Sequence, residues 1–161
     1  MISARDALER LRTGNRRFAS DTRSGDTLTN QRRRDEVAAG QEPFAIVLGC
    51  SDSRVPAEIV FDQGLGDLFV IRVAGNIVAS SQIGSVEFAA GRYGTRLVVV
   101  LGHSQCGAIL ATLEELQQQG RDSFLKAGGA TFQQIPCPND HPAFIDFLAK
   151  RVQRWLTESS V

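Results

Sequence analysis

The chain has 161 residues, of which 42% are hydrophobic and 22% are charged, and its formal net charge is zero. This length and composition predict one globular domain with a buried core, and the even charge balance argues against a nucleic-acid-binding protein. No apolar run reaches the roughly 20 residues of a membrane span, the N-terminus is too polar for a signal peptide, and three cysteines are an odd number for a disulfide framework. We therefore expect a cytoplasmic protein with reduced cysteines and with neither a nucleic-acid nor a membrane partner.

The first 40 residues are expected to form a helical arm. They carry nine arginines and six acidic residues, a net charge of +3, whereas the remainder of the chain carries −3. Ser3 precedes a helical pattern with four apolar positions on one face, namely Ala7, Leu8, Leu11 and Phe18. Gly25 ends this pattern, and a second helix is expected from about residue 30 to residue 39.

Short apolar runs then alternate with helical patterns. Three runs, 44–49, 68–71 and 97–102, are rich in β-branched residues and bounded by glycine, which is typical of strands buried on both faces of a parallel sheet. Helices are expected at 81–93 and 106–119. The order predicts an α/β fold, a central and mostly parallel β-sheet flanked by helices, with the N-terminal helical arm added to it.

We expect the whole chain to form a single domain with three regions. These are the arm (1–40), a core that carries the site (41–118) and a divergent tail (119–161). The tail contains turn-forming residues around 136–141 and the apolar spacing of a closing amphipathic helix at 143–155.

Two of the expected strands end in a glycine followed by a side chain that can bind a metal. Cys50 follows the first strand and His103 the third, and Cys106 comes three positions after His103. Sites in open α/β sheets form beyond the carboxyl ends of the strands, so these residues can converge. Two thiolates and an imidazole suit zinc and leave a fourth position open. Taken singly, each is more often a buried structural residue.

A charged pair lies in the loop directly after Cys50. The Arg54 guanidinium, two positions from Asp52, can pair with the carboxylate and keep it ionised. Taken in isolation, the pair is as readily a structural salt bridge. Beside a candidate metal ligand, it becomes a candidate catalytic pair.

Three segments together resemble a known family. The segments 50–58 (CSDSRVPAE) and 102–107 (GHSQCG) resemble the two signature segments of the β-class carbonic anhydrases, and 66–76 (GDLFVIRVAGN) is also similar. The resemblance runs from the N-terminal helix to about residue 118. Beyond it the family normally continues to a further strand, and its lack would expose an edge of the sheet.

The resemblance implies a zinc enzyme for the reversible hydration of CO₂ to bicarbonate. It implies that Cys50, His103 and Cys106 hold Zn²⁺ and that Asp52 and Arg54 form a catalytic dyad. Asp52 is either a catalyst or a fourth zinc ligand, because in similar proteins this carboxylate can turn onto the metal.

The resemblance also implies a homodimer or higher homo-oligomer with a substrate pocket lined across the interface. Gln41 and Phe69 stand where similar proteins place pocket residues, Phe88 stands where they often have tyrosine, and Gly107 follows the last metal ligand. The basic arm and the acidic remainder would complement each other in such a dimer.

Two alternative functions stay open. A similar fold could use zinc to hydrolyse another small electrophile, such as carbon disulfide. The chain could also be a non-catalytic, zinc-stabilised scaffold in which Cys137 or His141 supplies a fourth ligand. A scaffold would have no need of Asp52 and Arg54.

Overall fold

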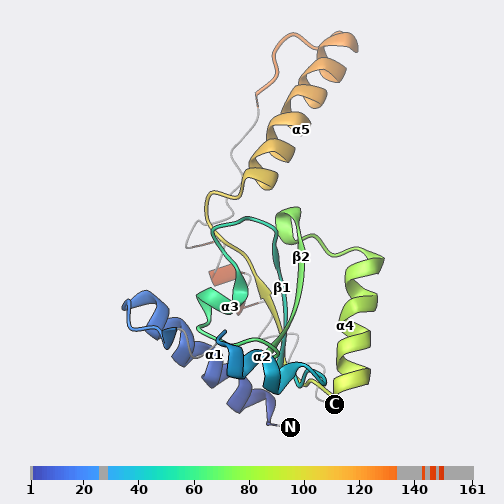
Figure 1. Ribbon diagram of the computed structural model, residues 1–161. Helices are drawn as coiled ribbons and strands as arrows, with labels where there is room; N and C mark the ends of the chain where they lie inside the picture. Colours follow the sequence, from blue (N-terminus) through green and yellow to red (C-terminus); the bar gives the residue numbers. More distant parts are fainter. Residues whose placement is uncertain (1, 26–28, 134–142, 144–145, 148, 151–161) are drawn as a thin grey trace. The chain divides into compact units, whose positions relative to one another are not determined.

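The computed structural model describes residues 2–25, 29–133, 143, 146–147 and 149–150 (Figure 1). The chain divides into two compact units, residues 1–113 and 114–161, and the first contains the sheet. The elements follow in the order α1 (Ala4–Ala19), α2 (Gln31–Val37), β1 (Ala45–Cys50), α3 (Ala57–Val60), β2 (Leu68–Val73), η2 (Ala74–Asn76), α4 (Ser80–Tyr93), β3 (Val98–Leu101) and α5 (Gly107–Lys126).

The three strands form one parallel sheet in the order β2-β1-β3. Cys50, the last residue of β1, pairs with Val73 of β2, and the preceding Gly49 pairs with Leu101 of β3. All three strands therefore end at the same edge of the sheet. The predicted α/β fold, with a parallel sheet, flanking helices and an N-terminal helical arm, is confirmed.

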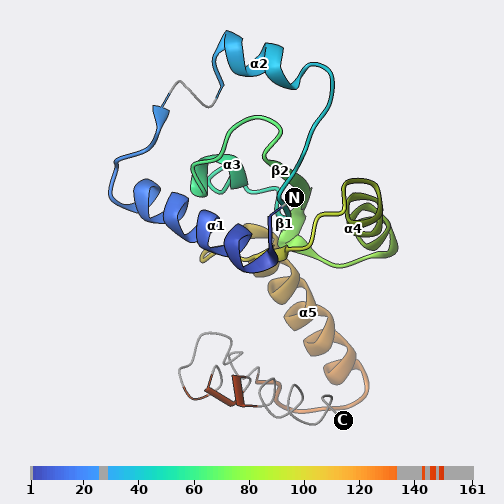
Figure 2. The same ribbon diagram turned by 90° about the horizontal axis from the view of Figure 1, so that it is seen from below.

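Helices cover both faces of this sheet (Figures 1 and 2). On one face α1 and α3 pack against the sheet through a buried cluster of Ala7, Leu11, Phe44, Ala45, Val47, Ala57 and Leu68. On the other face α4 packs against β1 and β2 through Ile46, Leu48, Ile71 and Ala89. Because β1 lies between two strands and two helical layers, all six of its residues are buried.

Helix α1 begins as the sequence predicts, since the Ser3 side chain accepts the Asp6 N–H at 3.1 Å. The predicted apolar face is wrong at its far end, where Phe18 remains 38% exposed. Ala7 and Leu11 are buried, and the next buried position is Gly14, which lies directly against the α3–β2 connection. The absence of a side chain at Gly14 lets the two segments approach closely.

The prediction that every strand is buried on both faces is also wrong for β3. Val98 is 46% exposed and Val100 is 61% exposed. In the register these residues lie beside Ile46 and Leu48 on the α4 face, but α4 packs over β1 and β2. Among the described residues β3 pairs only with β1.

The remaining differences concern the helices. The short α3 and η2 were not predicted, and α5 continues seven residues beyond the predicted end at residue 119. Of the predicted closing helix, the structure describes residues 143, 146–147 and 149–150, which are helical, and the predicted turn at 136–141 lies outside the described residues. None of the described helices is both long enough and apolar enough to span a membrane.

Candidate metal centre

The carboxyl edge of the sheet brings together the three predicted metal ligands. Cys50 ends β1, His103 follows β3 by two residues, and Cys106 directly precedes α5. Their candidate ligand atoms all lie within 4.8 Å of one another. Both cysteines are buried free thiols, with their sulfur atoms 3.8 Å apart. Convergence of residues 53 and 56 positions apart in the chain thus follows from the parallel pairing of β1 with β3.

The His103 ring is oriented to present one lone pair to this cluster. Its Nδ1 lies 3.0 Å from the Ser104 carbonyl oxygen. A carbonyl can only accept, so Nδ1 carries the proton and Nε2 is left with its lone pair. Nε2 is buried and has no hydrogen-bond partner among the described residues. Buried polar atoms are normally paired, and a ring held through its other nitrogen is the usual arrangement of a metal-binding histidine.

The surroundings of Cys50 favour its thiolate, which is the form that binds metals. In the protonated form of His103, the imidazolium is the largest influence that lowers the pKa of Cys50, to about 6, followed by the backbone N–H groups of Asp52 and Gly75 and the Cys106 thiol, while burial acts against them. The Gly75 N–H lies 3.3 Å from the Cys50 sulfur. The Cys50 thiolate in turn raises the pKa of His103 against the effect of burial, as do the Ser104 carbonyl and the Asp52 carboxylate.

The spacing of these donors fits a zinc ion. Two zinc–sulfur bonds of about 2.3 Å at a tetrahedral angle place their sulfurs about 3.8 Å apart. The two cysteine sulfurs are already 3.8 Å apart. Sulfur, nitrogen and sulfur donors form a soft to borderline set, which zinc prefers over magnesium or calcium. The protein thus offers three preorganised ligands, one of which is a ring nitrogen without a hydrogen-bond partner among the described residues.

The predicted pair of Asp52 and Arg54 lies directly beside the donor cluster. Arg54 Nε donates to Asp52 Oδ1 at 2.8 Å and Nη2 donates to Oδ2 at 2.7 Å. These bonds, with that from the Arg54 backbone N–H, hold the pKa of the Asp52 carboxyl well below its usual range. Asp52 Oδ2 is 3.9 Å from His103 Nε2. The Asp52 carboxylate therefore lies beside the site and is held by two hydrogen bonds from Arg54. It does not belong to the donor group of Cys50, His103 and Cys106.

Arg54 also joins the two loops that carry the site. Its Nη2 donates to the Gln105 carbonyl oxygen at 2.8 Å, in addition to its bond with Asp52. Gln105 lies between His103 and Cys106 and has a φ of 56°, a left-handed conformation that is uncommon for a residue with a side chain. A single guanidinium thus ties the loop after β1 to the loop after β3.

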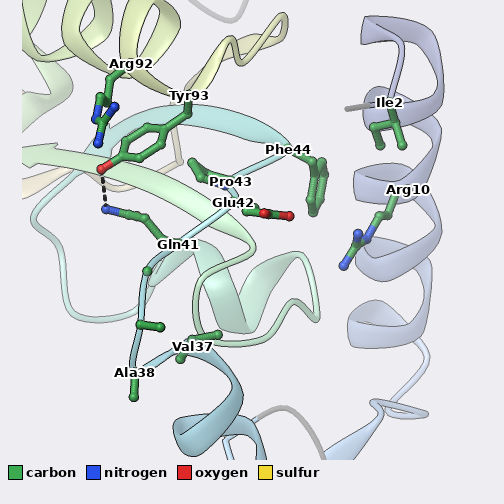
Figure 3. A pocket seen from close by; sticks show the side chains of 12 residues that line it. Ile2, Arg10, Val37, Ala38, Gln41, Glu42, Pro43, Phe44, Arg92 and Tyr93 are labelled. Carbon is green, nitrogen blue, oxygen red and sulfur yellow. Dashed lines mark hydrogen bonds between the residues drawn. The ribbon is translucent and has the colours of Figure 1, made fainter.

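Three of the four predicted pocket residues, Gln41, Phe69 and Phe88, gather at the other end of the sheet. Phe69 pairs with Ile46, four residues before Cys50, which corresponds to about 13 Å along the strand. The rings of Phe69 and Phe88 are 6.1 Å apart, and the Gln41 amide donates to the Tyr93 hydroxyl at 3.0 Å (Figure 3). Within one chain these residues form a cluster of their own, apart from the metal-binding group.

Gly107 begins α5, next to Cys106, whereas Cys137 and His141 lie outside the described residues. Sequence reasoning assigned no role to Tyr93, the only tyrosine of the chain, or to Arg72, which contacts the loop after β1. Their contacts arise from tertiary neighbours: Arg72 lies in the similar segment 66–76, but nothing in that segment indicates what its side chain contacts, and Tyr93 lies in none of the similar segments.

Comparisons with known proteins agree with the sequence resemblance. A family model described as carbonic anhydrase matches residues 45–136. Carbonic anhydrase 2 of Mycobacterium tuberculosis is 48% identical over 107 residues, which cover 66% of this chain and 51% of that protein. A carbonic anhydrase of Mycolicibacterium smegmatis is 45% identical over 115 residues, or 70% of this chain and 54% of that protein. The chain therefore spans about half the length of these relatives.

A solved structure is similar in fold as well. The β-carbonic anhydrase CcaA superimposes with a TM-score of 0.50 at 29% identity, over 75% of this chain and 62% of that one. The similarity of sequence and the similarity of fold thus point to the same family.

Proposed function

Since the chain belongs to the β-carbonic anhydrase family, we propose that it binds one zinc ion and catalyses the reversible hydration of CO₂ to bicarbonate. One observation carries this proposal: the thiol, imidazole and thiol donor group, with its unpaired His103 Nε2, lies beside a carboxylate that is held ionised by an arginine. The zinc ligands are Cys50, His103 and Cys106.

Backbone contacts support two of the three proposed ligands, Cys50 and His103. Zinc, when bound, lowers the pKa of a coordinated water from 15.7 to about 7 and so supplies a hydroxide nucleophile at neutral pH. The Gly75 N–H supports the charge of the Cys50 thiolate, and the Ser104 carbonyl fixes the His103 ring. These contacts hold the donor atoms in place before a metal arrives, which limits the rearrangement needed on binding.

Asp52 and Arg54 form the proposed catalytic dyad. Asp52 Oδ2, which lies 3.9 Å from His103 Nε2, would accept a hydrogen bond from the nucleophile that zinc supplies and would so orient that nucleophile toward CO₂. Arg54 binds both carboxylate oxygens and therefore limits rotation of the carboxylate toward the metal. We infer that these bonds hold Asp52 in the role of an orienting residue and that it would not serve as a fourth ligand of a bound zinc.

The substrate pocket requires a second copy of the chain in this proposal. Gln41, Phe69 and Phe88 lie away from the donor group of their own chain, and Phe88 is 53% exposed on α4. A homodimer would let this cluster face the donor group of the partner, next to Gly107. The dimer also fits the opposite charges of the arm and the remainder. The cytoplasmic location stays a prediction from the sequence.

The test combines metal analysis with stopped-flow CO₂ hydration on the full chain. We expect one zinc per chain and hydration activity in the unmodified protein. Asp52→Asn should keep its zinc and lose most of its turnover, because a neutral amide is a much weaker proton acceptor than a carboxylate. A general acid–base group contributes about 10²–10⁴-fold to the reaction rate. Asp21→Asn, at an exposed position in the turn after α1, is the matched control.

The same preparation separates the alternatives. Zinc without any CO₂ hydration would support the scaffold, and release of hydrogen sulfide from carbon disulfide would support the other hydrolase. A protein that purifies without zinc and does not take it up would contradict the metal site itself.

A further inference from the structure

The guanidinium of Arg72 reaches the loop that carries both a proposed zinc ligand and the proposed dyad. Arg72 lies near the end of β2, in register with Gly49. Its Nε donates to the carbonyl oxygen of Cys50 at 2.9 Å, and its Nη2 donates to the carbonyl oxygen of Asp52 at 2.7 Å. One side chain on the neighbouring strand thus binds two main-chain carbonyls on either side of Ser51.

These two bonds fix a short stretch of backbone. The N–H of Ser51, between the two carbonyls, donates to the Val73 oxygen at 3.2 Å, so three consecutive residues are tied to the end of β2. The Asp52 carbonyl also accepts the Val55 N–H at 3.2 Å and begins the turn that brings Arg54 back to the carboxylate. A change in the Asp52 backbone would therefore move both members of the dyad.

Arginine suits this arrangement better than other residues. Its planar guanidinium holds its donors in a fixed fork, whereas a lysine ammonium is a point charge on a flexible chain. Arg72 is an exposed residue, and an exposed arginine ordinarily keeps its head in water. Here the head instead turns back onto two carbonyls of the site, which gives up the freedom of a surface side chain.

We propose that Arg72 is a positioning residue that sets the direction of the Asp52 carboxylate relative to the Cys50 thiolate. It touches neither substrate nor metal in this role and acts through the main chain of residues 50–52. Its catalytic consequence rests on the proposed function, but its effect on the loop does not.

The test compares three variants of the full, zinc-loaded chain. Arg72→Met keeps the length of the side chain and removes both donors, Arg72→Lys keeps the charge without the fork, and Arg96→Met replaces another exposed arginine just before β3. Amide hydrogen exchange at Arg54 and Val55 reports the order of the loop, because their N–H groups bond to Asp52. Zinc content, kcat and KM are measured on the same samples.

We expect exchange at these two amides to become about tenfold faster in Arg72→Met and to stay at the wild-type rate in Arg96→Met. Loss of a residue that orients the groups in direct contact with a metal typically lowers activity by about 10–100-fold. We expect that loss in kcat, with KM changed by less than about threefold and one zinc per chain retained. Arg72→Lys should recover part of kcat, which a general loss of stability would not predict.

Wild-type exchange in both Arg72 variants would overturn the proposal, as would an equal fall of kcat in Arg96→Met. If Arg72→Met fails to fold, Arg72→Lys decides alone, since an unaltered loop and unaltered kcat in that variant show that the fork is not needed. If the unmodified chain does not hydrate CO₂, the proposed function fails while the exchange rates still decide whether Arg72 holds the loop.

Discussion

Gly14→Ala is expected to destabilise the protein, although such a change in the middle of an exposed helix normally does the opposite. Replacing glycine by alanine inside a helix usually stabilises it by about 0.5–1 kcal/mol, because the unfolded chain loses freedom. Gly14, however, faces the α3–β2 connection. A Cβ there would lie 2.8 Å from the carbonyl carbon of Phe61 and 2.8 Å from Nε2 of Gln63, and it would overlap the Phe61 carbonyl oxygen.

The size of the effect follows from these contacts. Ordinary carbon–carbon contacts lie at about 3.5–4.0 Å, and the Phe61 carbonyl oxygen overlaps the added Cβ, so α1 would have to withdraw by more than about 1 Å. Overpacking of this kind costs about 1–3 kcal/mol. The shift would also strain the bond of Asn15 Nδ2 to the Val60 oxygen, now 3.1 Å, and such a bond contributes about 0.5–1.5 kcal/mol. The weakened bond and the helix-propensity gain are of similar size and opposite sign, so the net loss is about the overpacking cost of 1–3 kcal/mol.

Chemical and thermal denaturation followed by circular dichroism, at equal zinc loading, measure this loss. For a chain of this size, 1 kcal/mol corresponds to about 2–4 °C in melting temperature, so Gly14→Ala should melt about 2–12 °C lower. Gly84→Ala on α4 is the matched control, because a Cβ there would meet nothing within 4 Å. It should melt slightly higher than the unmodified protein. Equal or greater stability of Gly14→Ala would refute the close approach of α1 to α3.

Three further outcomes are expected. Cys106→Ser should lose its zinc, because a hydroxyl is a much poorer ligand than a thiolate, and full occupancy by metal analysis would contradict the ligand assignment. Burial raises the pKa of Asp62, but Arg17 and the hydrogen bonds from Ser24 outweigh it and leave that pKa lowered. The stability that Asp62 contributes is therefore present above its unfolded pKa of about 3.9 and is lost as the pH falls through the folded pKa. Asp62→Asn should be less stable than the unmodified protein at pH 7 and should lose less stability between pH 4 and pH 2. If the urea midpoints of both proteins fell by the same amount over that range, the result would count against the pair of Asp62 and Arg17. Light scattering at micromolar concentration should give the mass of a dimer or a larger homo-oligomer, and a sharp monomer mass would exclude the pocket proposed across an interface.

The sequence predicts the framework of this molecule well because its signals are local. The run from Ala45 to Cys50 is continuously apolar, and parallel strands must end at one edge, so the convergence of Cys50, His103 and Cys106 could be expected from the sequence. The partial exposure of β3 could not be predicted in this way, since the exposure of Val98 and Val100 depends on how far α4 extends over the sheet.

Other features are invisible to pattern reasoning for physical reasons. The four residues of α3 make a single turn, which is too short to show helical periodicity. The roles of Gly14 and Arg72 depend on atoms that lie about 50 and 20 residues away in the chain, at Phe61 in one case and at Cys50 and Asp52 in the other. Their neighbours are set only when the helices dock on the sheet.

The pairing of β1 with β3 has a consequence for the order of events during folding. Ile46 and Val98 are partners across 52 positions of the chain, and the intervening segment must fold back before they meet. Such non-local parallel pairing is slow to form. Small zinc domains gather their ligands from a short stretch and fold around the metal, but here the thiols of Cys50 and Cys106 come together only after β3 docks beside β1. Metal uptake should therefore follow folding, so that zinc supply sets the loaded fraction of an already folded population, and a chelator added to the native protein should leave its secondary structure in place.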